Sequence, residues 1–91
     1  PMSEPQIARS LYMVPVAEID ASGGLRPLDL AWVEALTGLL KRDGQRHPVE
    51  IYRKRGGGYG MVTGRHRFAA VTALGWATID ADILEGAALD R

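Results

Sequence analysis

Cysteine is absent from this chain of 91 residues. Without a thiol the protein can form no disulfide bond, build no thiolate zinc site and use no cysteine nucleophile. Long apolar runs are missing as well: none approaches the roughly 20 residues of a membrane-spanning helix, and the N-terminus lacks the layout of a secretory signal peptide. These absences predict a cytoplasmic protein with no membrane partner.

The formal net charge of the chain is zero, because 11 lysine and arginine residues balance 11 aspartate and glutamate residues. The charges are nevertheless unevenly distributed. Residues 41–67 contain eight basic and two acidic side chains, a net charge of +6, together with both histidines, whereas residues 1–40 and 68–91 each carry −3. A local excess of positive charge favours an anionic partner, although a solvated basic surface gives the same pattern.

The length of the chain predicts one domain. Residues 1–10 show no apolar period and are predicted to be a flexible leader, so the domain is assigned to residues 11–91. Residues 11–16 have the composition of a β-strand. Because proline cannot donate a hydrogen bond to an interior ladder, Pro15 places this strand at a sheet edge.

Two helices are predicted. The first follows Asp29, a favoured N-cap residue, continues for about 14 residues and ends at Gly44. Its apolar residues recur at spacings of three and four: Leu30, Val33, Leu36, Leu39 and Leu40. The second helix covers about residues 65–74, is rich in alanine and stops at Gly75.

The remaining pattern is that of β-strands. Alternating side chains predict strands at residues 48–54 and 78–84, and residues 59–62 return antiparallel to the first of these through the glycine turn at 56–58. The order is therefore strand, helix, strand, strand, helix, strand. It predicts an α+β fold with a small mixed β-sheet and two main helices.

The start of the second helix breaks a local rule. A helix N-terminus carries about half a positive charge on its free N–H groups, so acidic side chains are favoured there. This helix instead begins with Thr63, Gly64, Arg65, His66 and Arg67. A bound phosphate would compensate, since backbone amides and guanidinium groups both bind its oxygens. Basic residues paired with nearby carboxylates are the alternative.

Several motifs together resemble the ParB/sulfiredoxin superfamily over residues 11–84. The most specific is the Gly-x-x-Arg helix start at Gly64, followed by Ala69-Ala70. Supporting motifs occur in the same order as in the superfamily: Val14-Pro15-Val16 through Ile19, the capped helix ending in Asp43-Gly44-Gln45, the strand Pro48-Val49-Glu50-Ile51 and the hairpin Gly58-Tyr59-Gly60. The resemblance implies the ParB N-terminal-like fold.

The resemblance also implies a nucleotide site. In this superfamily the Gly-x-x-Arg box binds the triphosphate of CTP in partition proteins, or of ATP in sulfiredoxin and a free-serine kinase. Carried over to this chain, the phosphate-binding residues would be Thr63, Gly64, Arg65, His66 and Arg67. The surrounding nucleotide pocket would include Arg26, Asp29, Gly44, Gln45 and Pro48. No residue is predicted to be a metal ligand.

The chain departs from the superfamily in three respects. Sulfiredoxin requires a cysteine where this chain has Arg65, so reduction of a peroxiredoxin sulfinate is excluded. Trp32 occupies the position of a phosphate-binding lysine of sulfiredoxins. Base stacking by Trp32 is the less favoured interpretation, since tryptophans usually pack in the core or at its rim. The helix-turn-helix domain of partition proteins is not in this sequence, so DNA would be read only by a longer native protein.

Three functions follow as hypotheses. The first is a regulatory module of a ParB-like protein that acts in plasmid or chromosome partition or in transcription. This module would bind CTP or ATP with Mg²⁺ and pair as a homodimer. The protein would be associated with the nucleoid or with a plasmid. The second is a magnesium-dependent phosphoryl-transfer enzyme or nuclease, for which Glu18, Asp29, Asp80 and Asp82 are the candidate acids, without an evident base. The third is DNA-backbone binding by residues 41–67. Whether the domain is an enzyme, such as a weak nucleotide triphosphatase, stays open.

Overall fold

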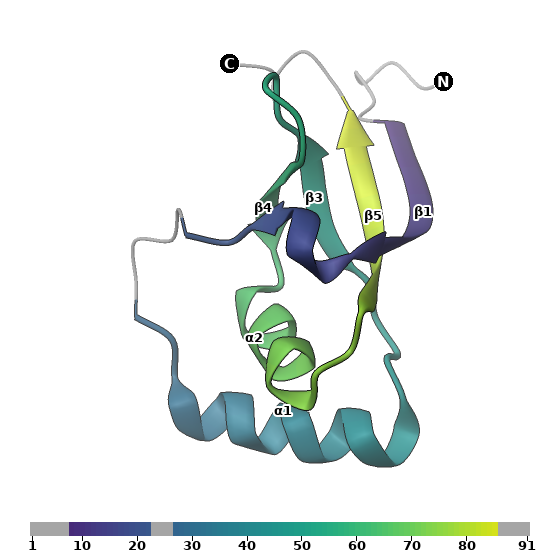
Figure 1. The fold of residues 1–91 in the computed structure, drawn as a ribbon. Helices are drawn as coiled ribbons and strands as arrows, with labels where there is room; N and C mark the ends of the chain where they lie inside the picture. Colours follow the sequence, from purple (N-terminus) through teal and green to yellow (C-terminus); the bar gives the residue numbers. More distant parts are fainter. Residues whose placement is uncertain (1–7, 23–26, 86–91) are drawn as a thin grey trace, which may run out of the picture.

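The computed structural model describes residues 8–22 and 27–85. It shows an α+β domain in which a five-stranded sheet lies above two helices (Figure 1). Along the chain the elements are β1 (Ala8–Pro15), the 3-10 helix η1 (Val16–Glu18), β2 (Ile19–Asp20), α1 (Leu30–Asp43), β3 (Val49–Arg53), β4 (Tyr59–Thr63), α2 (Arg65–Leu74) and β5 (Thr78–Glu85). The predicted fold class is confirmed.

The sheet is mixed, with the strand order β1-β5-β3-β4-β2. β1 is antiparallel to β5 and β3 is antiparallel to β4, whereas the β3–β5 and β2–β4 pairs are parallel. β1 lies at a sheet edge, as Pro15 predicts. It begins at Ala8, inside the segment predicted to be a leader, because backbone pairing with Glu85 continues beyond the apolar residues that mark the strand in the sequence.

Two short elements between β1 and α1 are absent from the sequence-based prediction. η1 spans three residues and β2 only two, so neither is long enough to show a hydrophobic period. β2 adds to the free edge of β4 in parallel, with Ile19 opposite Tyr59. Ile19 is buried there and becomes part of the core.

Both helices have the predicted bounds. Asp29 caps α1 by accepting hydrogen bonds from the N–H groups of Ala31 and Trp32, and α2 ends at Gly75 in the left-handed conformation. The predicted apolar stripe of α1 is only partly correct. Leu30 and Leu39 are 74% and 43% exposed, because α1 packs mainly on α2, which covers a narrower strip of its surface. Within the described residues, no helix has the length and apolar character to cross a membrane.

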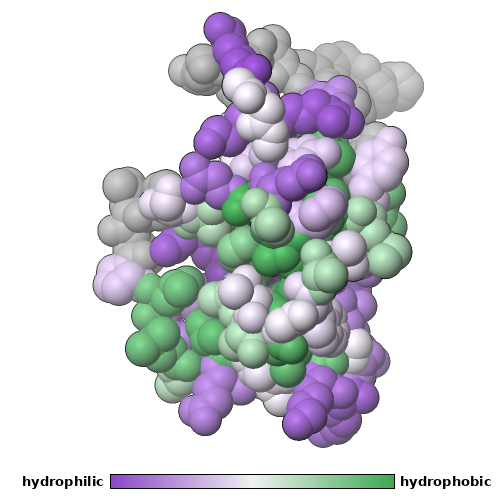
Figure 2. Space-filling view, viewed as in Figure 1, coloured by the Kyte–Doolittle hydropathy of each residue, from purple (hydrophilic) through white to green (hydrophobic). Residues whose placement is uncertain are grey.

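One hydrophobic core joins the sheet to the helices. It is formed by the inward-facing residues of β1, β3 and β5, with Leu36 and Leu40 of α1 and Ala70 and Val71 of α2. Val49 and Ile51 of β3 are completely buried, in agreement with the predicted alternation. On the surface, hydrophilic atoms gather at the hairpin end of the sheet and at the C-terminal end of α1, and apolar atoms gather over the start of α1 (Figure 2).

Candidate functional site

The start of α2 is fixed by a close contact between Gly64 and β3. Gly64 has a φ angle of 101°, in the region that favours glycine, and an ideal Cβ atom at this position would lie 2.6 Å from Cγ1 of Val49. No other residue fits without displacing the strand. The glycine therefore sets the first turn of α2 directly against the buried strand β3.

The first turn of α2 has no internal compensation for its positive dipole end. Gly64 provides no side-chain cap, and the turn contains no acidic residue. The first helical hydrogen bond runs from the N–H of Phe68 to the carbonyl oxygen of Gly64, at 2.8 Å, so the helix itself does not use the three preceding N–H groups. This is the electrostatic arrangement that the sequence predicts.

His66 joins the N-termini of the two helices. Its Nε2 atom accepts a hydrogen bond of 3.0 Å from the N–H of Asp29, the N-cap residue of α1. The positive ends of both helix dipoles therefore lie close together, which raises the electrostatic potential beyond what one helix provides. Nε2 already has a protein partner in this arrangement, so the predicted contact of His66 with phosphate would involve its other ring nitrogen or a rearrangement.

The two arginines of the first turn line different cavities. Arg67 lines a groove of about 300 Å³ together with Trp32 and Gly44. Arg65 lines two cavities of about 290 Å³ each, a polar one against the β3–β4 hairpin and an apolar one beside Phe68. Of these three cavities, none is lined by both arginines.

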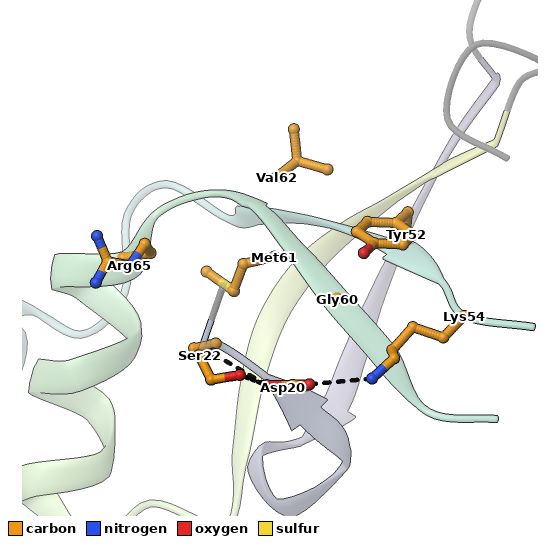
Figure 3. Close-up of a pocket in the computed structure, with 9 residues that line it drawn as sticks. Asp20, Ser22, Tyr52, Lys54, Gly60, Met61, Val62 and Arg65 are labelled. Carbon is orange, nitrogen blue, oxygen red and sulfur yellow. Dashed lines mark hydrogen bonds and ion pairs between the residues drawn. The ribbon is translucent and has the colours of Figure 1, made fainter. Parts of the chain in front are cut away.

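The polar cavity beside Arg65 contains an internal ion pair (Figure 3). Lys54 Nζ lies 3.0 Å from Oδ2 of Asp20, and the hydroxyl and N–H groups of Ser22 donate to Oδ1. The hydrogen bonds from Ser22 and the ion pair with Lys54 hold the pKa of the Asp20 carboxyl well below its usual range. In Figure 3 the guanidinium group of Arg65 points away from this pair. The cavity therefore has its own neutralised charges.

The other predicted site residues have varied surroundings. The hydroxyl group of Thr63 donates to Oε1 of Glu50 at 3.1 Å. The side-chain amide of Gln45 accepts from the N–H of Asp80 at 2.8 Å and donates to the carbonyl oxygen of the same residue at 2.9 Å. Gln45 thereby pairs with β5 just before β3 begins, and its amide is engaged. Pro48, half-buried, directly precedes β3, and Arg26 lies outside the described residues.

The candidate acids of the phosphoryl-transfer hypothesis do not form a cluster. Glu18 lies in η1, Asp29 caps α1, and Asp80 and Asp82 belong to β5. Over residues 8–22 and 27–85, no three histidine or acidic side chains are placed to hold a metal ion.

The groove at Arg67 includes residues that the sequence reasoning assigned to packing or to the surface. Trp32 is 49% exposed and forms one wall, and the exposed residues Arg46 and His47 lie at the rim. A sequence signal existed, because Trp32 lies one helical turn before the buried Leu36 and so on the side of α1 that packs toward α2. The sequence does not show in which direction the exposed part of the Trp32 ring points.

Two solved structures have the same fold. Sulfiredoxin from Arabidopsis thaliana is 26% identical with a TM-score of 0.75, and the match covers 85% of this chain and 86% of that one. The C-terminally truncated chromosome-partitioning protein ParB from Caulobacter crescentus, complexed with CTP-gamma-S, is 19% identical with a TM-score of 0.77. That match covers 88% of this chain and 47% of ParB. At this identity the second likeness shows the fold alone.

Sequence comparison agrees with the structural one. A nucleoid occlusion protein from Halalkalibacterium halodurans is 42% identical over 53 residues, which cover 58% of this chain. The match spans only 18% of the length of that relative. The ParB N-terminal domain family matches residues 2–88, nearly the whole chain. The chain therefore belongs to the ParB N-terminal domain family.

Proposed function

We propose that this domain binds the triphosphate of CTP or ATP, with Mg²⁺, at the start of α2. The observation that carries the proposal is the basic, acid-free first turn of α2, set against β3 by Gly64. A triphosphate would neutralise two converging helix dipoles and contact the guanidinium groups of Arg65 and Arg67. Mg²⁺ would be held mainly by the phosphate oxygens, as is usual for this ion. The CTP-gamma-S bound to the Caulobacter ParB supports the same ligand class.

We further infer that the domain is the regulatory module of a longer ParB-like protein of plasmid or chromosome partition or of transcription. Membership of the ParB N-terminal domain family and the likeness to a nucleoid occlusion protein support this role. In that setting the partners are DNA, contacted by other parts of the protein, and a second copy of the chain. The protein would then reside in the cytoplasm at the nucleoid or at a plasmid.

Calorimetric titration of the folded domain with CTP and ATP, each with Mg²⁺, tests the proposal. Saturable heat is expected with at least one of them. Because hydrogen bonds to charged groups contribute about 1.5–3 kcal/mol, we expect Arg67→Ala to weaken binding by roughly 10- to 100-fold. Lys41→Ala, which removes an equal charge from the exposed last turn of α1, is the matched control. Absence of heat with either nucleotide, from protein shown to be folded, would overturn the proposal.

A further inference from the structure

The groove that Arg67 lines has an apolar floor and a basic rim. Its floor is formed on α1 between Trp32 and Leu40, and its rim by Arg46, His47 and Arg67. At about 300 Å³ it has the volume of a small ligand pocket. Neither Arg46 nor Arg67 forms an ion pair with a carboxylate among the residues that the structure describes. The groove thus combines a flat apolar wall with uncompensated positive charge.

Trp32 is held beside the first turn of α2. The backbone N–H of Trp32 donates to Oδ1 of Asp29 at 3.2 Å, and the backbone N–H of Asp29 in turn donates to Nε2 of His66. This chain of hydrogen bonds ties the first turn of α1, which carries the ring, to the helix start that carries Arg67. Because about half of Trp32 is exposed, the indole has a free surface inside the groove.

Two polar side chains next to the groove are already engaged. The amide of Gln45 is bonded to the backbone of Asp80 and to the carbonyl oxygen of His47. Both carboxylate oxygens of Asp43 accept from the guanidinium group of Arg42, at 3.2 and 3.0 Å. Arg46 and His47 are exposed at the rim, so the ring of Trp32 provides the fixed surface for a base inside the groove.

We propose that this groove takes the base of the bound nucleotide by stacking on Trp32, which makes the domain a binder of purine nucleoside triphosphates in preference to pyrimidine ones. The inference rests on the proposed triphosphate site and narrows its ligand class. Stacking strength grows with ring area, so adenine and guanine gain more than cytosine and uracil, while neither purine is distinguished from the other. Arg67, at the junction of the groove and the first turn of α2, contacts the phosphates next to the nucleoside.

Fluorescence of Trp32 tests the proposal directly. In a Trp76→Phe background Trp32 is the sole tryptophan, because the chain has two. Titration with ATP, GTP, CTP and UTP, each with Mg²⁺, is expected to quench it, with ATP and GTP binding several-fold more tightly. Inorganic tripolyphosphate is expected to bind without quenching. Should Trp76→Phe fail to fold, the difference between the wild-type and Trp32→Phe signals gives the same reading.

Substitution of Trp32 separates this proposal from the triphosphate site. Trp32→Ala is expected to weaken ATP binding by about fivefold or more, since stacking of one base contributes about 1–3 kcal/mol, and to leave tripolyphosphate affinity unchanged. Trp32→Phe retains most of the affinity for ATP. Two results would refute stacking of the base on Trp32 without refuting the triphosphate site. One is tighter binding of CTP than of ATP, and the other is an equal loss of ATP and tripolyphosphate binding in Trp32→Ala. Failure of every nucleotide and of tripolyphosphate to bind overturns both.

Discussion

Replacement of Gly64 by alanine is expected to destabilise the domain more than any comparable substitution at a helix end. Two costs combine at this position. A non-glycine residue in left-handed backbone costs about 1–2 kcal/mol. The added methyl group also meets Cγ1 and Cβ of Val49 at 2.6 and 2.9 Å, and overpacking of a buried contact costs about 1–3 kcal/mol more. The sum of about 2–5 kcal/mol is large against the stability of a small domain.

Gly75→Ala provides the matched control. Gly75 has a φ angle of 77°, also left-handed, but an added Cβ would meet no atom within 4 Å. The two variants share the backbone cost and the lower entropy of the unfolded chain, so their difference isolates the contact with Val49. Urea unfolding followed by circular dichroism should show Gly64→Ala to be about 1–3 kcal/mol less stable than Gly75→Ala, at similar m-values. Equal midpoints would refute the close contact that positions α2.

Three further substitutions test the hydrogen bonds and the ion pair around the site. Gln45→Leu keeps the volume but removes both bonds to the backbone of Asp80, so urea unfolding should show a loss of about 1–3 kcal/mol; a change below about 0.5 kcal/mol would contradict this pairing. His66→Phe removes the acceptor of the Asp29 N–H, and hydrogen exchange of that amide should accelerate. Unchanged protection would show that this hydrogen bond does not stabilise the contact between the two helix starts. The lowered pKa of Asp20 contributes stability that is fully present above its unfolded-state pKa, near 3.8, and is lost as pH falls through the folded-state pKa. Asp20→Asn should therefore be less stable than wild type at neutral pH, and the gap in urea midpoints should close below about pH 4; a gap that stays constant with pH argues against the shift.

The helices and the hairpin could be predicted because their signals are local. Asp29 and Gly44 mark the ends of α1, and the alternation in β3 depends only on which side chains face the core. β2 gives no such signal, since its two residues are ordered by pairing with β4, which is distant in sequence. The exposure of Leu30 could not be predicted either. It depends on how much of α1 the second helix covers, which is a tertiary property.

The start of α2 was predictable as a basic helix terminus, because its residues are adjacent in the sequence. Consecutive residues of an α-helix are about 100° apart around its axis, so Arg65 and Arg67 are separated by about 200° and face opposite sides. The two cavities that they line follow from this spacing. The engagement of the Gln45 amide could not be foreseen, because its partner Asp80 is 35 residues away in the sequence. Residues predicted from a family motif thus include at least one, Gln45, whose side chain is engaged within the protein.

The basic segment of residues 41–67 does not form one surface in the folded chain, and this changes what its charge can bind. At the hairpin end, Arg53 pairs with Glu85 at 2.9 Å and Lys54 with Asp20 at 3.0 Å, so acidic residues from both flanking thirds neutralise it. At the end of α1, Arg42 pairs with Asp43 at 3.0 Å, whereas Lys41, Arg46 and Arg67 form no ion pair among the residues that the structure describes. A DNA backbone that followed the segment along its length would have to displace two carboxylates, whereas a compact polyanion at the helix ends displaces neither. Where the folded chain leaves its charge uncompensated, the geometry therefore favours a triphosphate over an extended phosphate backbone.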